Sequence, residues 1–132
     1  SEKLKKCISM SNEELSRIFV ELPSFMARWK SLGLNDADLL RLEIELLNNP
    51  KVGAVLQGTG GVRKVRFAFE DRGKSGSIRV IYIDFEIYEK IFLLTAYAKA
   101  DQANLTKQER NDLKGLVELL ELDLEKGGWK HV

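Results

Sequence analysis

A nearly continuous apolar run from Ile91 to Ala98 is the feature that most constrains how this chain can fold. A strand with one solvated face alternates apolar and polar residues, whereas a run that is apolar at almost every position is typical of a strand buried on both faces. The preceding run, Ile78 to Phe85, is also dense in Ile, Val, Tyr and Phe. Together the two runs predict the centre of a small sheet.

The other elements are predicted from periodicity and from helix caps. Val62 to Phe69 alternates with the period of a strand, and Thr106-Lys-Gln-Glu109 has the spacing of a capping box at a helix start. The chain further predicts a strand at 17–22, a helix at 24–32, a helix after Asn35 that ends at Asn48, and a helix from Thr106 to near Gly127. The expected fold is α+β, a small antiparallel-rich sheet with an N-terminal αα-hairpin and a C-terminal helix.

Length and composition indicate one domain. The 132 residues are 44% hydrophobic and 31% charged, which fits a single globular unit. We interpret residues 1–16 as an N-terminal arm and 17–132 as the folded domain. Met10 is a candidate natural start, so residues 1–9 are either an appended segment or a flexible arm.

Cysteine use and hydropathy indicate a cytoplasmic protein. Cys7 is the only cysteine, so the chain has no disulfide framework and suits a reducing compartment. No apolar run approaches the roughly 20 residues that cross a bilayer, and the opening residues lack the apolar core of a signal peptide. We therefore expect neither a membrane partner nor export.

The charge is polarised along the chain, although its formal total is only +1. Residues 13–49 hold four basic and seven acidic residues, whereas residues 58–82 hold six basic and two acidic ones. A local concentration of positive charge is what a phosphate-binding surface needs.

The candidate site is a set of cations with two tyrosines nearby in the predicted sheet. Alternation places Lys64 and Arg66 on one face of their strand, and Tyr97 and Lys99 on one face of theirs. The full set is Arg63, Lys64, Arg66, Arg72, Lys74, Arg79, Lys99, Tyr82 and Tyr97. Each cation alone reads as a solvated surface charge, but a cluster without interspersed carboxylates suggests that an anion completes it. The pattern alone leaves nucleic-acid binding and an ordinary surface both open.

Several common catalytic sites are excluded by residue type. His131 is the only histidine and lies beside the C-terminus, which argues against a histidine metal site, a Ser/His/Asp triad or a two-histidine ribonuclease. Gly73-Lys74-Ser75 looks like the end of a P-loop, but Ala68 stands where the motif needs glycine. We predict no metal and no cofactor.

Three ordered segments carry a more specific signal. They read NNPKVGAVLQGTGGVRKVRFA, then GKSGSIRVIY, then LLTAYAKAD followed by LTKQER. Together they resemble the HigB/RelE family of type II toxin–antitoxin toxins, over a stretch from Phe19 to Leu120. The resemblance implies a compact RelE-like fold and a cognate antitoxin, expected to be a helix-turn-helix protein like HigA. It also implies an endoribonuclease that cuts mRNA in the ribosomal A site, which inhibits translation and arrests growth.

The resemblance also implies a mechanism and roles for the cations. In this family the ribose 2′-OH attacks the neighbouring phosphorus, leaving a 2′,3′-cyclic phosphate and a 5′-OH. By position, Lys64 and Arg66 match the family's basic pair and take phosphate and base-or-acid roles. Arg79 would bind the scissile phosphate, and Lys99 matches the basic residue that closes the last strand.

The remaining candidates are expected to contact RNA or the ribosome. They are Arg63, Arg72, Lys74, Tyr82 and Tyr97. Some relatives carry a second basic residue where this chain has Ala100, and a C-terminal tyrosine that is missing here. Tyr97 or Tyr82 either replaces that tyrosine or supports the core, and neighbouring cations would favour a tyrosinate.

Two other functions remain open from sequence. The same fold class includes ParE-like poisons of DNA gyrase, which lack the basic cleavage site. An inactive RNA-binding module is the other alternative, and it would bind RNA with a steep salt dependence and no effect on growth. Codon preference and the antitoxin-binding surface are not encoded in any recognisable motif.

Overall fold

The computed structural model describes residues 4–9, 16–68 and 77–128. Its elements follow in the order β1 (Leu4–Ser9), β2 (Ser16–Glu21), α1 (Pro23–Ser31), α2 (Asp36–Asn48), β3 (Ala54–Val55), β4 (Arg63–Ala68), β5 (Ser77–Phe85), a 3-10 turn (Glu86–Tyr88), β6 (Lys90–Ala98) and α3 (Lys107–Glu125). The α+β prediction, with an N-terminal helical hairpin and a C-terminal helix, is confirmed.

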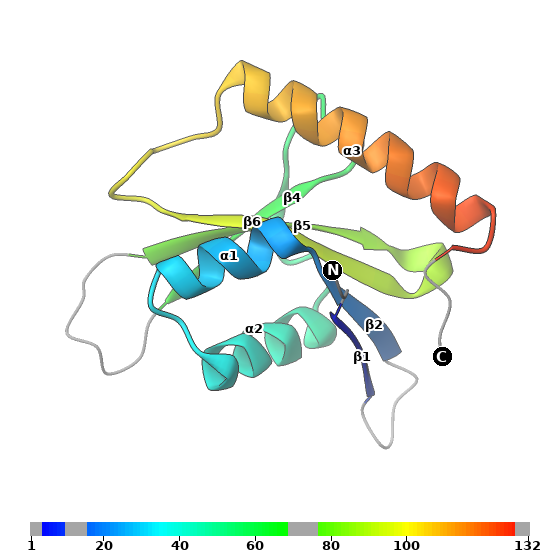
Figure 1. Cartoon of the computed structure of the whole chain (residues 1–132), viewed down its shortest axis with the longest axis horizontal. Helices are drawn as coiled ribbons and strands as arrows, with labels where there is room; N and C mark the ends of the chain where they lie inside the picture. The colour runs from blue at the N-terminus through cyan, green and yellow to red at the C-terminus, as the bar shows by residue number, and fades with distance from the viewer. Residues whose placement is uncertain (1–3, 10–15, 69–76, 129–132) are drawn as a thin grey trace.

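One six-stranded sheet, in the order β1-β2-β6-β5-β4-β3, divides the molecule into two layers. Helix α3 covers one face, and α1 and α2 cover the other (Figure 1). We call these the α3 face and the α1/α2 face. Strands β4, β5 and β6 form the predicted antiparallel meander, and β2 joins β6 in parallel.

Strand β6 lies at the centre of the sheet and is buried on both faces, as its apolar sequence predicted. Phe92, Leu94 and Tyr97 pack against α3 residues such as Val117, while Ile91, Leu93 and Ala96 pack against the layer of α1 and α2. Burying apolar surface contributes a free energy of about 25 cal/mol for each square ångström, so this two-sided packing is the main source of stability.

Helix α1 completes the edge of β6 that β2 leaves open. Strand β2 pairs with β6 only as far as Leu93. Beyond that point the Ser24 hydroxyl donates to the Leu94 carbonyl at 2.9 Å, and Arg28 Nε donates to the Ala96 carbonyl at 3.1 Å. Side chains of a helix thus replace the missing neighbour strand, so the buried carbonyls are not left unpaired.

Capping boxes begin two of the helices. Asn35 and Asp38 form a capping box at α2, and Thr106 and Glu109 form the predicted one at α3. In the second box Glu109 donates its backbone N–H to the Thr106 hydroxyl at 3.0 Å, and the Glu109 carboxylate accepts from the Thr106 N–H at 2.8 Å. Such caps contribute about 1 kcal/mol each.

Two strands were not predicted. Leu4–Ser9, expected from the sequence to lie in an N-terminal arm, pairs antiparallel with β2 as strand β1. Ala54–Val55 forms the short edge strand β3 against β4. Residues 69–76, which connect β4 to β5, lie outside the described residues. Among the described helices, none is long and apolar enough to cross a membrane.

The segment from Pro50 to Gly53 is held against the sheet by Tyr82 and Arg63. The Tyr82 hydroxyl donates to the Pro50 carbonyl at 2.8 Å and accepts from the Gly53 N–H at 3.0 Å. Arg63 Nη1 donates to the Gly53 carbonyl at 2.7 Å. A Cβ at Gly53 would lie 2.8 Å from the Lys64 carbonyl oxygen, so only glycine fits this close approach. Both side chains therefore stabilise the fold.

We predict that Tyr82→Phe lowers the free energy of unfolding by about 1–3 kcal/mol, because the buried Pro50 and Gly53 backbone groups lose their partner. Urea unfolding of the two proteins measures the difference. Tyr88→Phe is the matched control, since Tyr88 is partly exposed in the 3-10 turn. Equal stability of Tyr82→Phe and the parent protein would contradict the structural role.

Candidate active site

Three neighbouring strands bring two arginines and a tyrosine into one row across the sheet. In the register Arg66 of β4 lies opposite Arg79 of β5, and Arg79 lies opposite Tyr97 of β6. Residues directly opposite in antiparallel strands have Cβ atoms about 4.5–5.5 Å apart. We call Arg66, Arg79 and Tyr97 the basic row. It lies on the α3 face, because Phe67, Ile78 and Val80 beside it pack on the other face.

A bulge in β6 turns Tyr97 towards this face. Ile81 pairs with Thr95 and Tyr82 with Leu93, so Leu94 has no opposite partner. Strict alternation from Leu93, which packs on the α1/α2 face, would place Tyr97 on that face too. The extra residue reverses the alternation, and Tyr97 joins the α3 face. Bulges are known to redirect side chains beside functional sites.

Two lysines flank the basic row. Lys64 lies two residues before Arg66 on β4 and therefore on the same face, and its Nζ is 3.4 Å from Oδ1 of Asn104 in the loop before α3. Lys99 follows β6 two residues after Tyr97, is exposed, and donates its backbone N–H to the Ser77 carbonyl at 3.1 Å. Arg79 Nη1 donates to the Ser77 hydroxyl at 2.6 Å, which fixes its direction.

The cations of this site are not neutralised by carboxylates of the described residues. The ion pairs among the described residues have Arg17, Arg41 and Lys51 as their cations. None involves Lys64, Arg66, Arg79 or Lys99. Opposed like charges destabilise a sheet. The site thus keeps repulsion that a bound anion would relieve.

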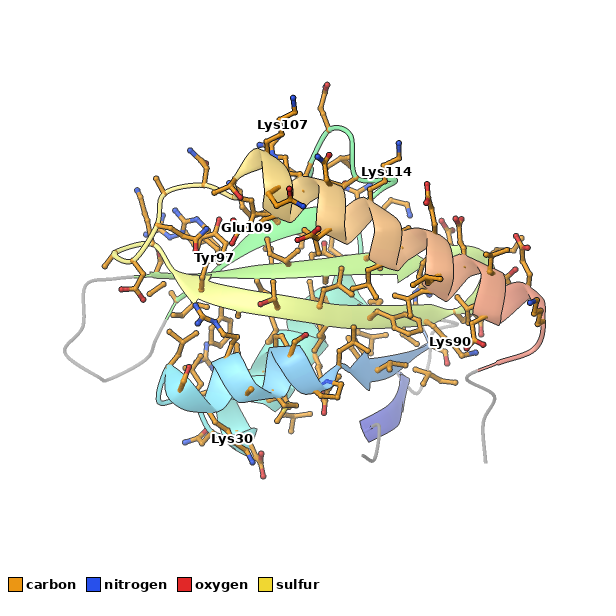
Figure 2. The ribbon with its side chains drawn as sticks, turned by 45° about the horizontal axis from the view of Figure 1, so that its top comes forward. Lys30, Lys90, Tyr97, Lys107, Glu109 and Lys114 are labelled. Atoms are coloured by element: carbon orange, nitrogen blue, oxygen red, sulfur yellow. The ribbon has the colours of Figure 1, made fainter. Side chains whose placement is uncertain are left out.

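Tyr97 lies buried between the sheet and the first turn of α3 (Figure 2). Only 2% of its surface is exposed, and its hydroxyl has no hydrogen-bond partner among the described residues. Burial raises the pKa of Tyr97 above its usual value, and this outweighs the opposite effect of Arg79. The expected lowering of a tyrosine pKa by clustered cations is therefore not found, because desolvation dominates.

Glu109, in the first turn of α3, is the acidic group that acts on Tyr97. The Thr106 backbone N–H holds the pKa of Glu109 below its usual value, and Gln102 Nε2 also donates to the carboxylate, at 3.3 Å. The charge of Glu109 acts on Tyr97, whose pKa it raises, and Arg28 of α1 in turn lowers the pKa of Glu109. The carboxylate is thus ionised at neutral pH but already hydrogen-bonded within its own loop.

The structure separates two predicted site residues from the rest. Tyr82 is fully buried on the α1/α2 face, where burial raises its pKa, and its hydroxyl is occupied by the Pro50 and Gly53 backbone. Arg63, one residue from Lys64, points to that face too and bonds the Lys51 and Gly53 carbonyls. Neither lies with the basic row. Arg72 and Lys74 lie outside the described residues.

Sequence reasoning missed the residues that α3 and its preceding loop contribute. Arg110 is close enough to Tyr97 to lower its pKa, and Asn104 contacts Lys64. Arg110 directly follows Glu109 of the capping box, so the sequence predicted that Arg110 lies in the first turn of the helix. It did not indicate that Tyr97 would be near. Within the described residues, no group of three or more His, Cys, Asp or Glu side chains is arranged to hold a metal ion.

The fold and the site define a small α+β protein with cations gathered on one face of a mixed sheet under a C-terminal helix. Comparison with known proteins identifies its family. The family model described as the RelE toxin of the RelE/RelB toxin–antitoxin system matches residues 16–126. The chain belongs to this RelE toxin family. As a toxin of such a system, it has a cognate antitoxin as partner.

Among solved structures, the chain is similar to the E. coli toxin RelE, a double arginine-to-alanine mutant in the free state. The two share 16% sequence identity with a TM-score of 0.46, over 64% of this chain and 85% of that chain.

We predict that Arg66→Gln raises the free energy of unfolding by about 0.2–1 kcal/mol at low ionic strength, because it removes repulsion with Arg79 directly opposite. The gain should vanish at about 1 M salt, where the Debye length is about 3 Å. Urea unfolding at both salt concentrations measures it. The control Lys30→Gln removes an exposed cation from α1. A loss of stability in Arg66→Gln, or an equal gain in the control, would argue against repulsion in the row.

Proposed function

We propose that this toxin is a ribosome-dependent endoribonuclease that cuts mRNA, inhibits translation and is neutralised by its cognate antitoxin. One observation carries the proposal. Lys64, Arg66 and Arg79 lie on the α3 face, exposed Lys99 follows the end of β6 next to Ser77, and no described carboxylate neutralises these four cations. The family membership supports the toxin class.

The proposed substrate is a phosphodiester in RNA. The 2′ oxygen attacks phosphorus, the bond from phosphorus to the 5′ oxygen breaks, and a 2′,3′-cyclic phosphate and a 5′-OH result. Negative charge builds on the non-bridging oxygens in the transition state. The guanidinium groups of Arg66 and Arg79, opposite each other on adjacent strands, supply planar donor forks for those oxygens.

Two proton transfers accompany this attack. The 2′-OH loses a proton to a base, and the 5′ oxygen gains one from an acid. The Tyr97 hydroxyl is buried and burial raises its pKa, so little of the tyrosinate that could act as the base is present at neutral pH. We assign the proton transfers to Lys64, on the face of the row and oriented by Asn104, and to Lys99, which directly follows the end of β6.

In this proposal the ribosome positions the mRNA for cleavage. The basic row is short, so it holds one phosphodiester and does not by itself select a sequence. A ribosomal A site would supply the single-stranded mRNA and its alignment. The proposal therefore includes the ribosome and A-site mRNA as partners, a helix-turn-helix antitoxin like HigA, and a cytoplasmic location.

We predict that combining Lys64→Ala with Arg79→Ala abolishes growth arrest and lowers the cleavage rate at least about 100-fold, because transition-state donors are removed. Primer extension on mRNA from expressing cells measures cleavage. The control combines Lys30→Ala with Lys126→Ala, which removes two exposed cations from other regions. Both proteins should unfold cooperatively in urea.

Unchanged cleavage in the Lys64→Ala/Arg79→Ala protein would overturn the assignment. Growth arrest with broken chromosomal DNA and intact mRNA would instead indicate a gyrase poison. Growth without arrest in cells that express the unaltered toxin and no antitoxin would indicate an inactive RNA-binding module.

We further predict that Tyr97→Phe reduces cleavage less than tenfold, whereas loss of a general acid or base costs about 100-fold or more. Its stability should not fall, because the deleted hydroxyl is buried without a described partner. Single-turnover cleavage on programmed ribosomes and urea unfolding provide the two readouts, with Tyr88→Phe as the control. A 100-fold loss of cleavage in a stable Tyr97→Phe protein would make Tyr97 a catalytic residue.

A further inference from the structure

The first half of α3 carries its positive charge on one side. Lys107, Arg110 and Lys114 follow the spacing i, i+3, i+7, which at 100° per residue keeps them within about 60° of one another around the helix. We call these three residues the α3 basic flank. Lys107 and Lys114 are exposed and Arg110 is half-buried. In the described part of the chain, no carboxylate lies within ion-pair distance of any of them.

The other side of the same half-helix is acidic. Glu109 and Asp112 lie there, and Glu109 is near enough to Arg28 of α1 for Arg28 to lower its pKa. Further along, the side that begins with the basic flank continues with Glu118, Glu121 and Glu125. The positive surface of α3 is therefore limited to its first two turns, which lie next to the basic row.

Two observations place the start of α3 against the site. Glu109 and Arg110, in the first turn of the helix, both act on the pKa of Tyr97, which Glu109 raises and Arg110 lowers. The loop that leads into β4 packs against Val117 of the same helix, since a Cβ at Gly60 would lie 3.4 Å from Cγ1 of Val117. Lys107 and Lys114 lie on the side of α3 turned away from α1 (Figure 2). The flank thus borders the β4 side of the site.

We propose that the α3 basic flank binds the sugar-phosphate backbone of the single RNA strand that passes through the basic row. The inference rests on the proposed function and extends it. A scissile phosphate held by Arg66 and Arg79 brings the phosphates of neighbouring nucleotides with it. Lys107 and Lys114 are about 10 Å apart along the helix axis, so they can contact different phosphates of one strand.

Continuity and charge favour this occupant. The row forms the floor and the α3 basic flank forms a wall, and Lys64, beside the row, contacts Asn104 in the loop that leads into α3. All the charge along this path is positive among the residues named, whereas the opposite side of α3 would repel phosphate. An RNA strand leaving the row is therefore directed along the β4 side of α3.

The test uses binding rather than cleavage. The probe is fully 2′-O-methylated RNA, which lacks the attacking hydroxyl, as a dinucleotide that fills only the row and as a single-stranded dodecamer that extends beyond it. The variant combines Lys107→Gln with Lys114→Gln, which should fold because removing cations from the start of a helix relieves its dipole. The control combines Lys30→Gln with Lys126→Gln and has the same net charge. Fluorescence anisotropy at several salt concentrations gives the slope of log K against log salt.

We expect the variant to reduce the magnitude of the dodecamer slope by about 1.4, or about 0.7 for each phosphate that is no longer neutralised. Dinucleotide affinity and the slope of the control should stay unchanged. An unchanged slope, an equal reduction in the control, or a reduction with duplex RNA but not with the single strand would overturn the inference. Cleavage by the parent toxin is scored separately on ribosomes. Cleavage with an unchanged slope would reject this inference alone, and a reduced slope without cleavage would reject the nuclease alone.

Discussion

The register of three adjacent strands is the constraint on which the site depends. Arg66, Arg79 and Tyr97 come from positions spread over more than thirty residues, and only their antiparallel pairing makes them neighbours. Because side chains alternate between faces, a slip of one residue between β4 and β5 would move Arg66 away from Arg79. Phe67 of β4 and Ile78 and Val80 of β5 oppose such a slip, since all three must face the hydrophobic layer of α1 and α2. The geometry of the candidate site and the packing of the core are thus set by one arrangement.

The two ends of β5 treat charge in opposite ways. Near its end, the side chain of Asp84 is 1% exposed and pairs with Arg17 at 2.8 Å and with Lys51 at 3.5 Å. Near its start, Arg79 faces Arg66, and among the described residues its side chain bonds only the Ser77 hydroxyl. The fold therefore neutralises Arg17 and Lys51 with a buried carboxylate at the end of β5 that is remote from the basic row. The uncompensated pair of Arg79 on this strand and Arg66 on the adjacent strand β4 lowers stability locally, which is the usual signature of a binding site.

Much of this fold could be predicted from the sequence, because the signals involved are local. Capping residues, alternation in β4 and the apolar run of β6 each depend on neighbours within a few positions. Strand β1 was missed although its partner β2 is the next element, because these residues were interpreted as an arm. The parallel pairing of β2 with β6 was missed because it joins residues far apart in the sequence, such as Ile18 and Lys90. For the candidate site, Lys64, Arg66 and Arg79 were identified by type and alternation. Alternation also separates Arg63 from Lys64, although charge alone had grouped them. The orientation of Tyr97 required knowledge of the bulge at Leu94, and no pattern in a single strand reveals a bulge.

The capping box of α3 explains why the site keeps its positive charge. Glu109 lies close enough to Tyr97 to influence its ionisation, so its carboxylate is the natural candidate to neutralise the row. Both the Thr106 backbone N–H and the Gln102 amide donate to that carboxylate, which holds it in the loop. The same residue therefore starts the helix that roofs the site and is prevented from pairing with the arginines below. A local motif recognised from four residues thus has a non-local consequence: it leaves Arg66 and Arg79 available for an external anion.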